Sequence, residues 1–275
     1  MNRLPVEKRV QIVAALVEGN GIRATARMAD VSTNTVMKLL ADLGTACSEF
    51  QDKALQNLNC KRIQVDEIWS FCYSKQKNVP EKHRGEFGYG DVWTWTAIDA
   101  DTKLVPSWHV GLRSASDAAT FIEDLASRLA SHVQITSDGL RVYIDAIEGA
   151  FGADVDYAML VKLYGSDPDN ERRYSPAVCT GIEKTTINGD PDPKHVSTSF
   201  VERQNLTMRM SMRRFTRLTN AFSKKVQNHA AAIALHFMWY NFGRIHKTLR
   251  CTPAMEAKVT DHVWTIAEIV GLLDA

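Results

Sequence analysis

The chain has 275 residues, 45% of them apolar, and a formal net charge of +1. This length and composition suffice for one large folded domain with a small accessory one. No run of about 18 uncharged apolar residues occurs, and the first ten residues lack the apolar segment of a signal peptide, so the sequence argues against a membrane or secreted protein and predicts a cytoplasmic one.

The cysteines are odd in number and form no CxxC pair. This spacing argues against a disulfide framework and against a zinc ribbon. We therefore expect reduced thiols at Cys47, Cys60, Cys72, Cys179 and Cys251.

Three short helices are predicted within residues 1–44, the first beginning after Pro5 and the third ending at Gly44. Small residues in the second helix, a tight turn and a polar-tipped third helix predict a helix-turn-helix DNA-binding domain. The alternative is a generic three-helix module used for dimerisation. On the first interpretation, the residues that face the DNA major groove are Thr33, Asn34, Thr35 and Lys38.

A connecting helix is predicted at residues 45–60, and the pattern then changes to strands. Residues 61–73 alternate between apolar and polar and are rich in Ile, Val, Trp and Phe. Two further strands are predicted at 92–98 and 105–112, joined by a short turn. The three strands together predict an antiparallel meander.

Helices and strands alternate after the meander. A helix at 117–130, capped by Ser116 or Asp117, precedes a strand at 133–136, a helix at 143–151 and a strand at 157–163. A further helix begins near residue 199. The order β-β-β-α-β-α-β-α is that of the ribonuclease H-like fold, so we predict an α/β protein with a mixed sheet that carries helices on its faces.

The predicted catalytic domain covers residues 61–250 and contains one long connection without periodicity, at 165–198. Such a connection either orders on DNA, or clamps the active site, or is a partly disordered insertion. Helices are predicted again at 199–217 and 224–244. The last residues, 251–275, are predicted to form a C-terminal helical cap.

Charge is unevenly distributed along the chain. Between Arg203 and Arg250 lie ten Lys and Arg residues and no Asp or Glu, whereas residues 99–173 are acidic. Such segregation predicts a basic surface that faces one direction, although a solvated helix face is the simpler alternative. We favour contact with DNA phosphates. The candidate contacts are Arg209, Arg213, Arg214, Arg217, Lys224 and Lys225.

Three carboxylates lie in contexts that can present them at one point, namely Asp66 in a strand, Asp138 at a strand end and Glu202 in a helix. Phosphoryl transfer on nucleic acid uses two divalent ions to stabilise the attacking and leaving oxygens. Mg²⁺ prefers oxygen ligands, so three carboxylates suit it.

Each carboxylate also has a purely structural interpretation. Asp66 stands beside Glu67, and strand alternation sends the two to opposite faces without choosing between them. Asp138 fits a turn dipeptide. Glu202 fits a capping box in which its carboxylate reaches back to the Ser199 amide.

Three sequence blocks carry a resemblance to a known family. They are Val65-Asp66-Glu67-Ile68-Trp69-Ser70-Phe71, Ser137-Asp138-Gly139 and Phe200-Val201-Glu202-Arg203-Gln204-Asn205. Arg209 follows Glu202 by seven residues, and further similar segments lie at 240–249 and 252–256. Over roughly residues 60–273, the chain resembles a DDE transposase of a bacterial insertion sequence, and most of all the smallest classical family of these elements.

The resemblance implies that Asp66, Asp138 and Glu202 form a catalytic triad that binds two Mg²⁺ or Mn²⁺ ions, which selects Asp66 over Glu67. It implies that Arg209 contacts a DNA phosphate. The implied partners are double-stranded DNA, as the element's terminal inverted repeats and as target, and further copies of the chain on that DNA. We accordingly expect association with the nucleoid.

One departure from the family concerns zinc. Members often carry a zinc-binding element ahead of the helix-turn-helix, and this chain has no Cys or His cluster there. Two other functions stay open at this stage. One is a metal-dependent DNA nuclease without strand transfer, and the other is a non-catalytic DNA-binding regulator.

Overall fold

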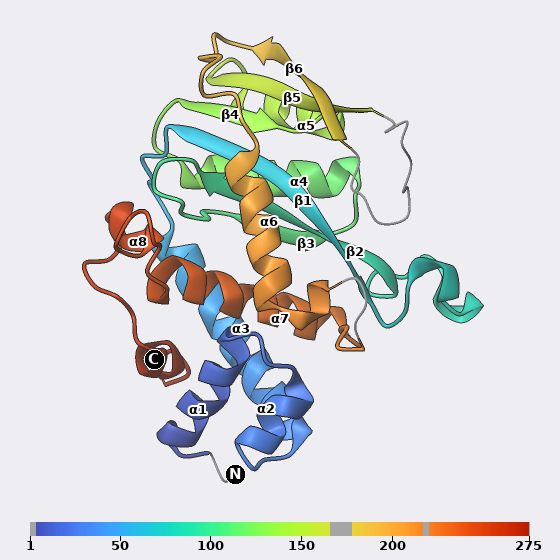
Figure 1. Cartoon of the computed structure of the whole chain (residues 1–275), viewed down its shortest axis with the longest axis vertical. Helices are drawn as coiled ribbons and strands as arrows, with labels where there is room; N and C mark the ends of the chain where they lie inside the picture. Colours follow the sequence, from blue (N-terminus) through green and yellow to red (C-terminus); the bar gives the residue numbers. More distant parts are fainter. Residues whose placement is uncertain (1–3, 166–177, 217–219, 275) are drawn as a thin grey trace.

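The computed structural model describes residues 4–165, 178–216 and 220–274. It is an α/β protein with one mixed six-stranded sheet and a group of N-terminal helices (Figure 1). The strand order across the sheet is β3-β2-β1-β4-β5-β6. The strands are β1 (Arg62–Cys72), β2 (Gly90–Asp99), β3 (Trp108–Gly111), β4 (Val133–Ser137), β5 (Val155–Gly165) and β6 (Val178–Asn188).

The predicted strands and helices of the sheet region occur in the predicted order as far as β5, but an unpredicted strand, β6, stands between β5 and α6. A π-helical turn at Trp239–Gly243 continues α7. The α-helices are α1 (Val6–Val17), α2 (Ile22–Met28), α3 (Thr33–Ala54), α4 (Ala115–Arg128), α5 (Val142–Phe151), α6 (Ser199–Ser211), α7 (Val226–Met238), α8 (Pro253–Glu256) and α9 (Ile266–Gly271).

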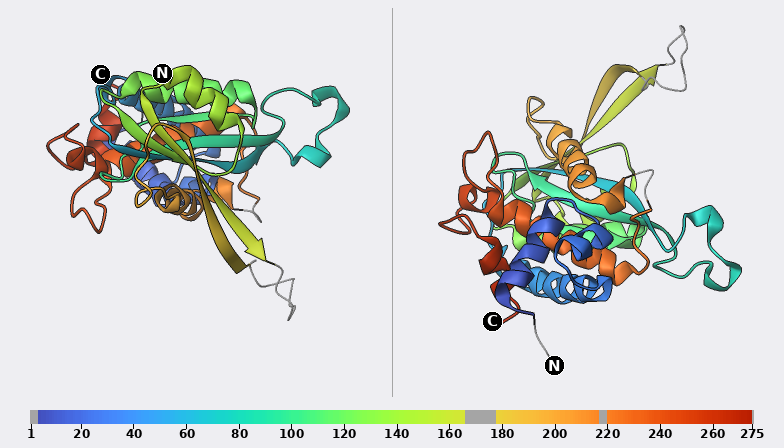
Figure 2. Two further views of the ribbon diagram at one scale, coloured as in Figure 1. Left: turned by 90° about the horizontal axis from the view of Figure 1, so that it is seen from above. Right: turned by 60° about the horizontal axis from the view of Figure 1, so that its bottom comes forward.

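The sheet combines both strand directions. β1 pairs antiparallel with β2 and parallel with β4, and β4 pairs parallel with β5. Helices α4 and α5 lie on one face of the sheet, and α6 lies on the other (Figures 1 and 2). Successive residues of β1 therefore point alternately into two different layers.

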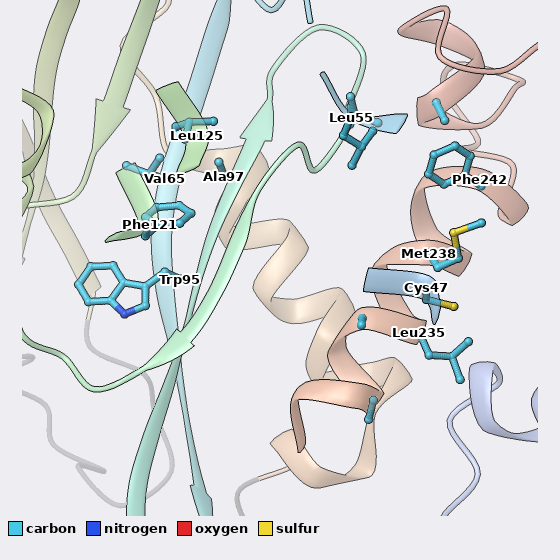
Figure 3. Packing of buried hydrophobic residues seen from close by; sticks show 14 of the residues in the cluster. Cys47, Leu55, Val65, Trp95, Ala97, Phe121, Leu125, Leu235, Met238 and Phe242 are labelled. Carbon is cyan, nitrogen blue, oxygen red and sulfur yellow. The ribbon is translucent and has the colours of Figure 1, made fainter. Parts of the chain in front are cut away.

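Both layers are packed with apolar side chains. On the α4–α5 face, Trp95 of β2 contacts Phe121 and Tyr143, with ring centroids 6.1 and 5.4 Å away. Val65 belongs to the same cluster (Figure 3). On the α6–α7 face, Ile68 of β1 belongs to a second buried cluster with residues of α6 and α7. Residues flanking Asp66 are thus fixed from both sides of the sheet.

The predicted helix end at Gly44 is wrong. The helix that Ser32 caps continues without interruption as α3 to Ala54, so there is no separate connecting helix at 45–60. Gly44 serves close packing instead, because a Cβ atom there would lie 2.5 Å from Ala231 of α7. Its neighbour Cys47 belongs to the same buried cluster as the α7 side chains shown in Figure 3.

Two further expectations need correction. Ser114, rather than Ser116 or Asp117, caps α4, since its hydroxyl accepts a hydrogen bond from the Asp117 amide. The connection at 165–198 is not wholly without regular structure, because β6 lies within it and pairs antiparallel with β5. Residues 189–198 form the described loop that leads to α6, and residues 166–177 lie outside the described residues.

The C-terminal segment packs against the N-terminal helices. α9 lies beside α1 (Figure 1). Arg9 of α1 forms an ion pair of 3.3 Å with Asp274. Within the described ranges, no helix combines the length and the apolar character needed to cross a lipid bilayer.

Gly44→Ala should destabilise the protein, although alanine is the better helix former by up to about 1 kcal/mol. Overpacking against Ala231 opposes that gain and costs about 1–3 kcal/mol. Gly149→Ala is the matched control, because a Cβ atom at this α5 position would have no neighbour within 4 Å. Thermal unfolding should show a lower Tm for the first variant and an equal or higher Tm for the second. Equal increases in both would contradict close packing at Gly44.

Candidate metal centre

Asp66 and Asp138 lie side by side on neighbouring parallel strands. The β1–β4 register aligns Gln64 with Thr136, and the same register carried two residues further brings Asp66 level with Asp138. Asp138 follows the last residue of β4, where its Oδ1 accepts a hydrogen bond of 2.9 Å from the Leu140 amide. The strand pairing itself therefore brings these two carboxylates together.

Glu67 joins them from the opposite face of β1. One carboxylate oxygen each from Asp66, Glu67 and Asp138 lies within 4.8 Å of the others. Glu67 points into the α4–α5 layer, where Arg113 forms an ion pair of 2.6 Å with it and the Tyr143 hydroxyl donates a hydrogen bond of 3.1 Å. Alternation along β1 thus holds as predicted, yet both acidic side chains reach the same centre.

The electrostatics of the centre reflect three crowded acids. Burial and the negative charges of Asp138 and Glu202 raise the pKa of Asp66 to about 7, against hydrogen bonds from the Glu67 amide and Asn205 that lower it. Burial and the negative charges of Asp138 and Asp66 raise the pKa of Glu67 to about 7, although Arg113 lowers it. A divalent cation would relieve this repulsion, and the donor set consists of the oxygen ligands that Mg²⁺ and Mn²⁺ accept.

Helix α6 is fixed over β1 by two side-chain contacts. The Gln64 Oε1 accepts hydrogen bonds from the amides of Phe200 and Val201, at 2.8 and 3.1 Å, and so satisfies the free N–H groups of the first turn. One turn later, the Asn205 amide donates a 2.8 Å hydrogen bond to Asp66. Residues three apart share a helix face, so Glu202 faces the same side as Asn205.

Glu202 lies outside the group of three carboxylates, and the capping box expected for it is not formed. The Ser199 amide donates to Ser197 Oγ rather than to Glu202, and Thr198 is the N-cap residue. Glu202 Oε1 accepts a 2.7 Å hydrogen bond from the Thr198 hydroxyl, and both of its oxygens contact Lys162. The structural interpretation of Glu202 as a capping-box residue is therefore wrong.

The residues predicted to read DNA lie at the first turns of α3. Thr33, Asn34 and Lys38 are exposed, whereas Thr35 is half-buried. The Thr35 amide donates to the Ser32 hydroxyl, which fixes the start of the helix.

The basic residues differ in what they contact. Arg209, Arg213, Lys224 and Lys225 are exposed. Arg214 turns inward, where its guanidinium donates to Ser223 Oγ and to the Asn228 carbonyl and burial lowers its pKa to about 10. These contacts give Arg214 a structural role. Arg217 lies outside the described residues.

A groove of about 1090 Å³ separates the N-terminal helices from the segment around η3 (Arg213–Phe215). Thr33 of α3 lines one side, and residues 220–224 line the other. The groove thus joins the two surfaces for which the sequence predicts DNA contact. The cations along it are Arg23, Arg27, Arg213, Arg214 and Lys224.

The sequence did not identify four residues of the centre as members of the site. Glu67 and Asn205 stand inside the blocks that carry the resemblance, so their position was a usable signal. Gln64 and Lys162 had none, because their partners lie 136 and 40 residues away along the chain.

Comparisons with known proteins assign no family to this chain. No protein-family model matches it, and the search of curated proteins finds no match.

Asp66→Asn should stabilise the metal-free protein in a pH-dependent way. Between the ordinary pKa of 3.8 and the folded pKa of about 7, the native state binds a proton that the unfolded state lacks, so this group costs stability as pH rises through that window. In EDTA, the variant and the wild type should unfold alike near pH 4. At pH 8 the variant should be more stable by about 4 kcal/mol, the free energy that corresponds to a pKa shift from 3.8 to about 7.

The control is Asp145→Asn, an exposed carboxylate on α5. It should shift the unfolding free energy by a constant small amount across the same pH range. A gap between Asp66→Asn and wild type that does not widen with pH would contradict the crowding of acids at the centre.

Proposed function

We propose that this protein is a DDE-type DNA transposase with a ribonuclease H-like catalytic domain and an N-terminal helix-turn-helix. The observation that carries the proposal is the placement of Asp66 and Asp138 on adjoining strands, with the Glu202 helix fixed above them by Gln64 and Asn205. The order of strands and helices and the mixed sheet support the fold assignment.

Asp66, Asp138 and Glu202 would hold two divalent ions, with Glu67 beside them. Bound there, Mg²⁺ or Mn²⁺ supplies the positive charge that neutralises phosphate oxygens and activates a hydroxyl nucleophile. Asn205 orients the Asp66 carboxylate through its hydrogen bond. Arg113 balances the charge of Glu67 from the α4–α5 layer, which keeps the acidic centre compatible with folding.

DNA would lie along the basic surface between α3 and α6. The exposed start of α3 suits base contacts, and the exposed cations of α6 and its surroundings suit phosphate contacts. We propose that the partners are the element's terminal repeats, the target duplex and other copies of this chain assembled on that DNA.

A labelled duplex taken from the DNA that flanks the coding sequence tests the activity. In Mg²⁺ the wild type should nick this duplex and join its 3′ end to a target plasmid, with the two products scored on separate gels. Asp138→Asn removes a ligand charge and should lower nicking by at least about a hundredfold while DNA binding is retained.

Asp145→Asn again serves as the control and should cleave like the wild type. Cleavage that persists in excess EDTA would remove the metal from the mechanism. Nicking without joining would identify a nuclease, and binding without either reaction would identify a regulator.

Arg209→Ala should weaken DNA binding and lower the slope of log K against log salt by about one counterion. The reason is that Arg209 is exposed on the same helix as Glu202, seven residues on. Arg141→Ala is the matched control, since this exposed arginine precedes α5 on the opposite face of the sheet. Fluorescence anisotropy at several salt concentrations measures both. Identical slopes for the two variants would assign Arg209 an ordinary surface role.

A further inference from the structure

Lys162 forms an ion pair with Glu202, the third carboxylate of the proposed triad. It stands on β5, and its Nζ lies 2.6 and 2.5 Å from the two carboxylate oxygens of Glu202. The Lys162 side chain is half-buried and that of Glu202 is exposed, with 29% and 43% of their surfaces accessible to solvent. The Thr198 hydroxyl adds a hydrogen bond to Glu202 Oε1. Both Glu202 oxygens are therefore already engaged, one of them twice.

The contacts of Asp66 and Asp138 differ from those of Glu202. In the part of the chain that the structure describes, Asp66 accepts hydrogen bonds from the Glu67 amide and Asn205, and Asp138 accepts one from the Leu140 amide. All three donors are neutral. Within the proposed triad, Asp66 and Asp138 are thus held by neutral groups, whereas Glu202 is held by a cation.

A divalent ion and an ammonium group compete for the same carboxylate oxygens. Ammonium donates to oxygen atoms that a metal ion would coordinate, and the two positive charges repel each other at contact distance. An ion that uses Glu202 must therefore replace Lys162, whereas an ion that uses Asp66 and Asp138 need not.

We propose that Lys162 is a displaceable internal cation, which holds Glu202 in the metal-free protein and leaves when an ion binds through Glu202. This inference rests on the proposed function, because it assumes a metal centre at Asp66, Asp138 and Glu202. Lys162 is a positioning residue in this scheme. Its displacement makes binding of one ion weaker than binding of the other, and it frees a positive charge beside the site.

Titration of the metal-free protein with Mn²⁺, in the absence of DNA, tests the proposal through free Mn²⁺ measured by electron paramagnetic resonance. Lys162→Met keeps the apolar stem and removes the competing charge. The variant should bind the weaker of two ions about fivefold more tightly, the effect expected when a partly exposed ion pair no longer competes. The stronger ion should be bound with unchanged affinity. Lys162→Gln replaces this variant if the methionine impairs folding.

Lys184→Met is the matched control. This lysine lies on β6 of the same hairpin, but its Nζ contacts the Pro193 carbonyl at 2.6 Å rather than a carboxylate. If the loss of a positive charge from the β5–β6 hairpin were sufficient, Lys162→Met and Lys184→Met would change the Mn²⁺ affinity equally. We expect no change for Lys184→Met.

A double-mutant cycle with Glu202→Gln completes the test. In that background the carboxylate charge is absent, so adding Lys162→Met should change nothing. Equal Mn²⁺ affinities in Lys162→Met and wild type would overturn the proposal, as would an equal gain in Lys184→Met. Wild-type Mn²⁺ binding that Asp66→Asn leaves intact would instead overturn the metal centre and the proposed function with it.

Discussion

The parallel pairing of β1 with β4 places Asp66 beside Asp138 within a sheet that is covered on both faces. Two buried negative charges repel each other and lose hydration, so the surrounding residues have to stabilise them. Neutral N–H donors hold the two aspartates, Arg113 balances Glu67 from one layer, and Lys162 balances Glu202 from the other side. Burial and the neighbouring negative charges nevertheless raise the pKa of Asp66 to about 7.

The position of α6 depends on the same strand. Gln64 and Asp66 point to one face of β1, and they bind α6 at its first turn and at Asn205. The helix that carries Glu202 is therefore fixed relative to the two aspartates before any ligand binds. Such preorganisation lowers the cost of assembling a site from three separate elements.

The N-terminal helices are joined to the body by packing rather than by a linker. α3 runs from the predicted DNA-reading residues to Ala54 and packs closely on α7 where Gly44 meets Ala231. The basic groove lies between these helices and the segment before α7. In the proposed function, the DNA-reading helix α3 and the catalytic centre are thus held in a fixed relative position. DNA bound at α3 would then have a defined path toward α6.

Local patterns in the sequence determined a large part of this protein. The alternation of β1, the amphipathic helices α1 and α4, and the separation of Asp66 from Glu67 follow from periodicities that a short segment carries by itself. The blocks around Asp66, Asp138 and Glu202 identified candidate ligands, because residue type and spacing are visible without a fold. For residues such as Asp138 and Glu202, these patterns allowed two local interpretations and did not decide between them.

Only the tertiary structure decided the rest. The local sequence predicts a helix end at Gly44, yet Gly44 lies within α3. Its missing side chain leaves room for Ala231 of α7. β6 has weak alternation and becomes a strand through pairing with β5. Arg214 lies among cations that face solvent, but its side chain completes a buried contact with Ser223. The partner of Lys162 is 40 residues away, and contacts between such distant residues exist only once the chain has closed around its core.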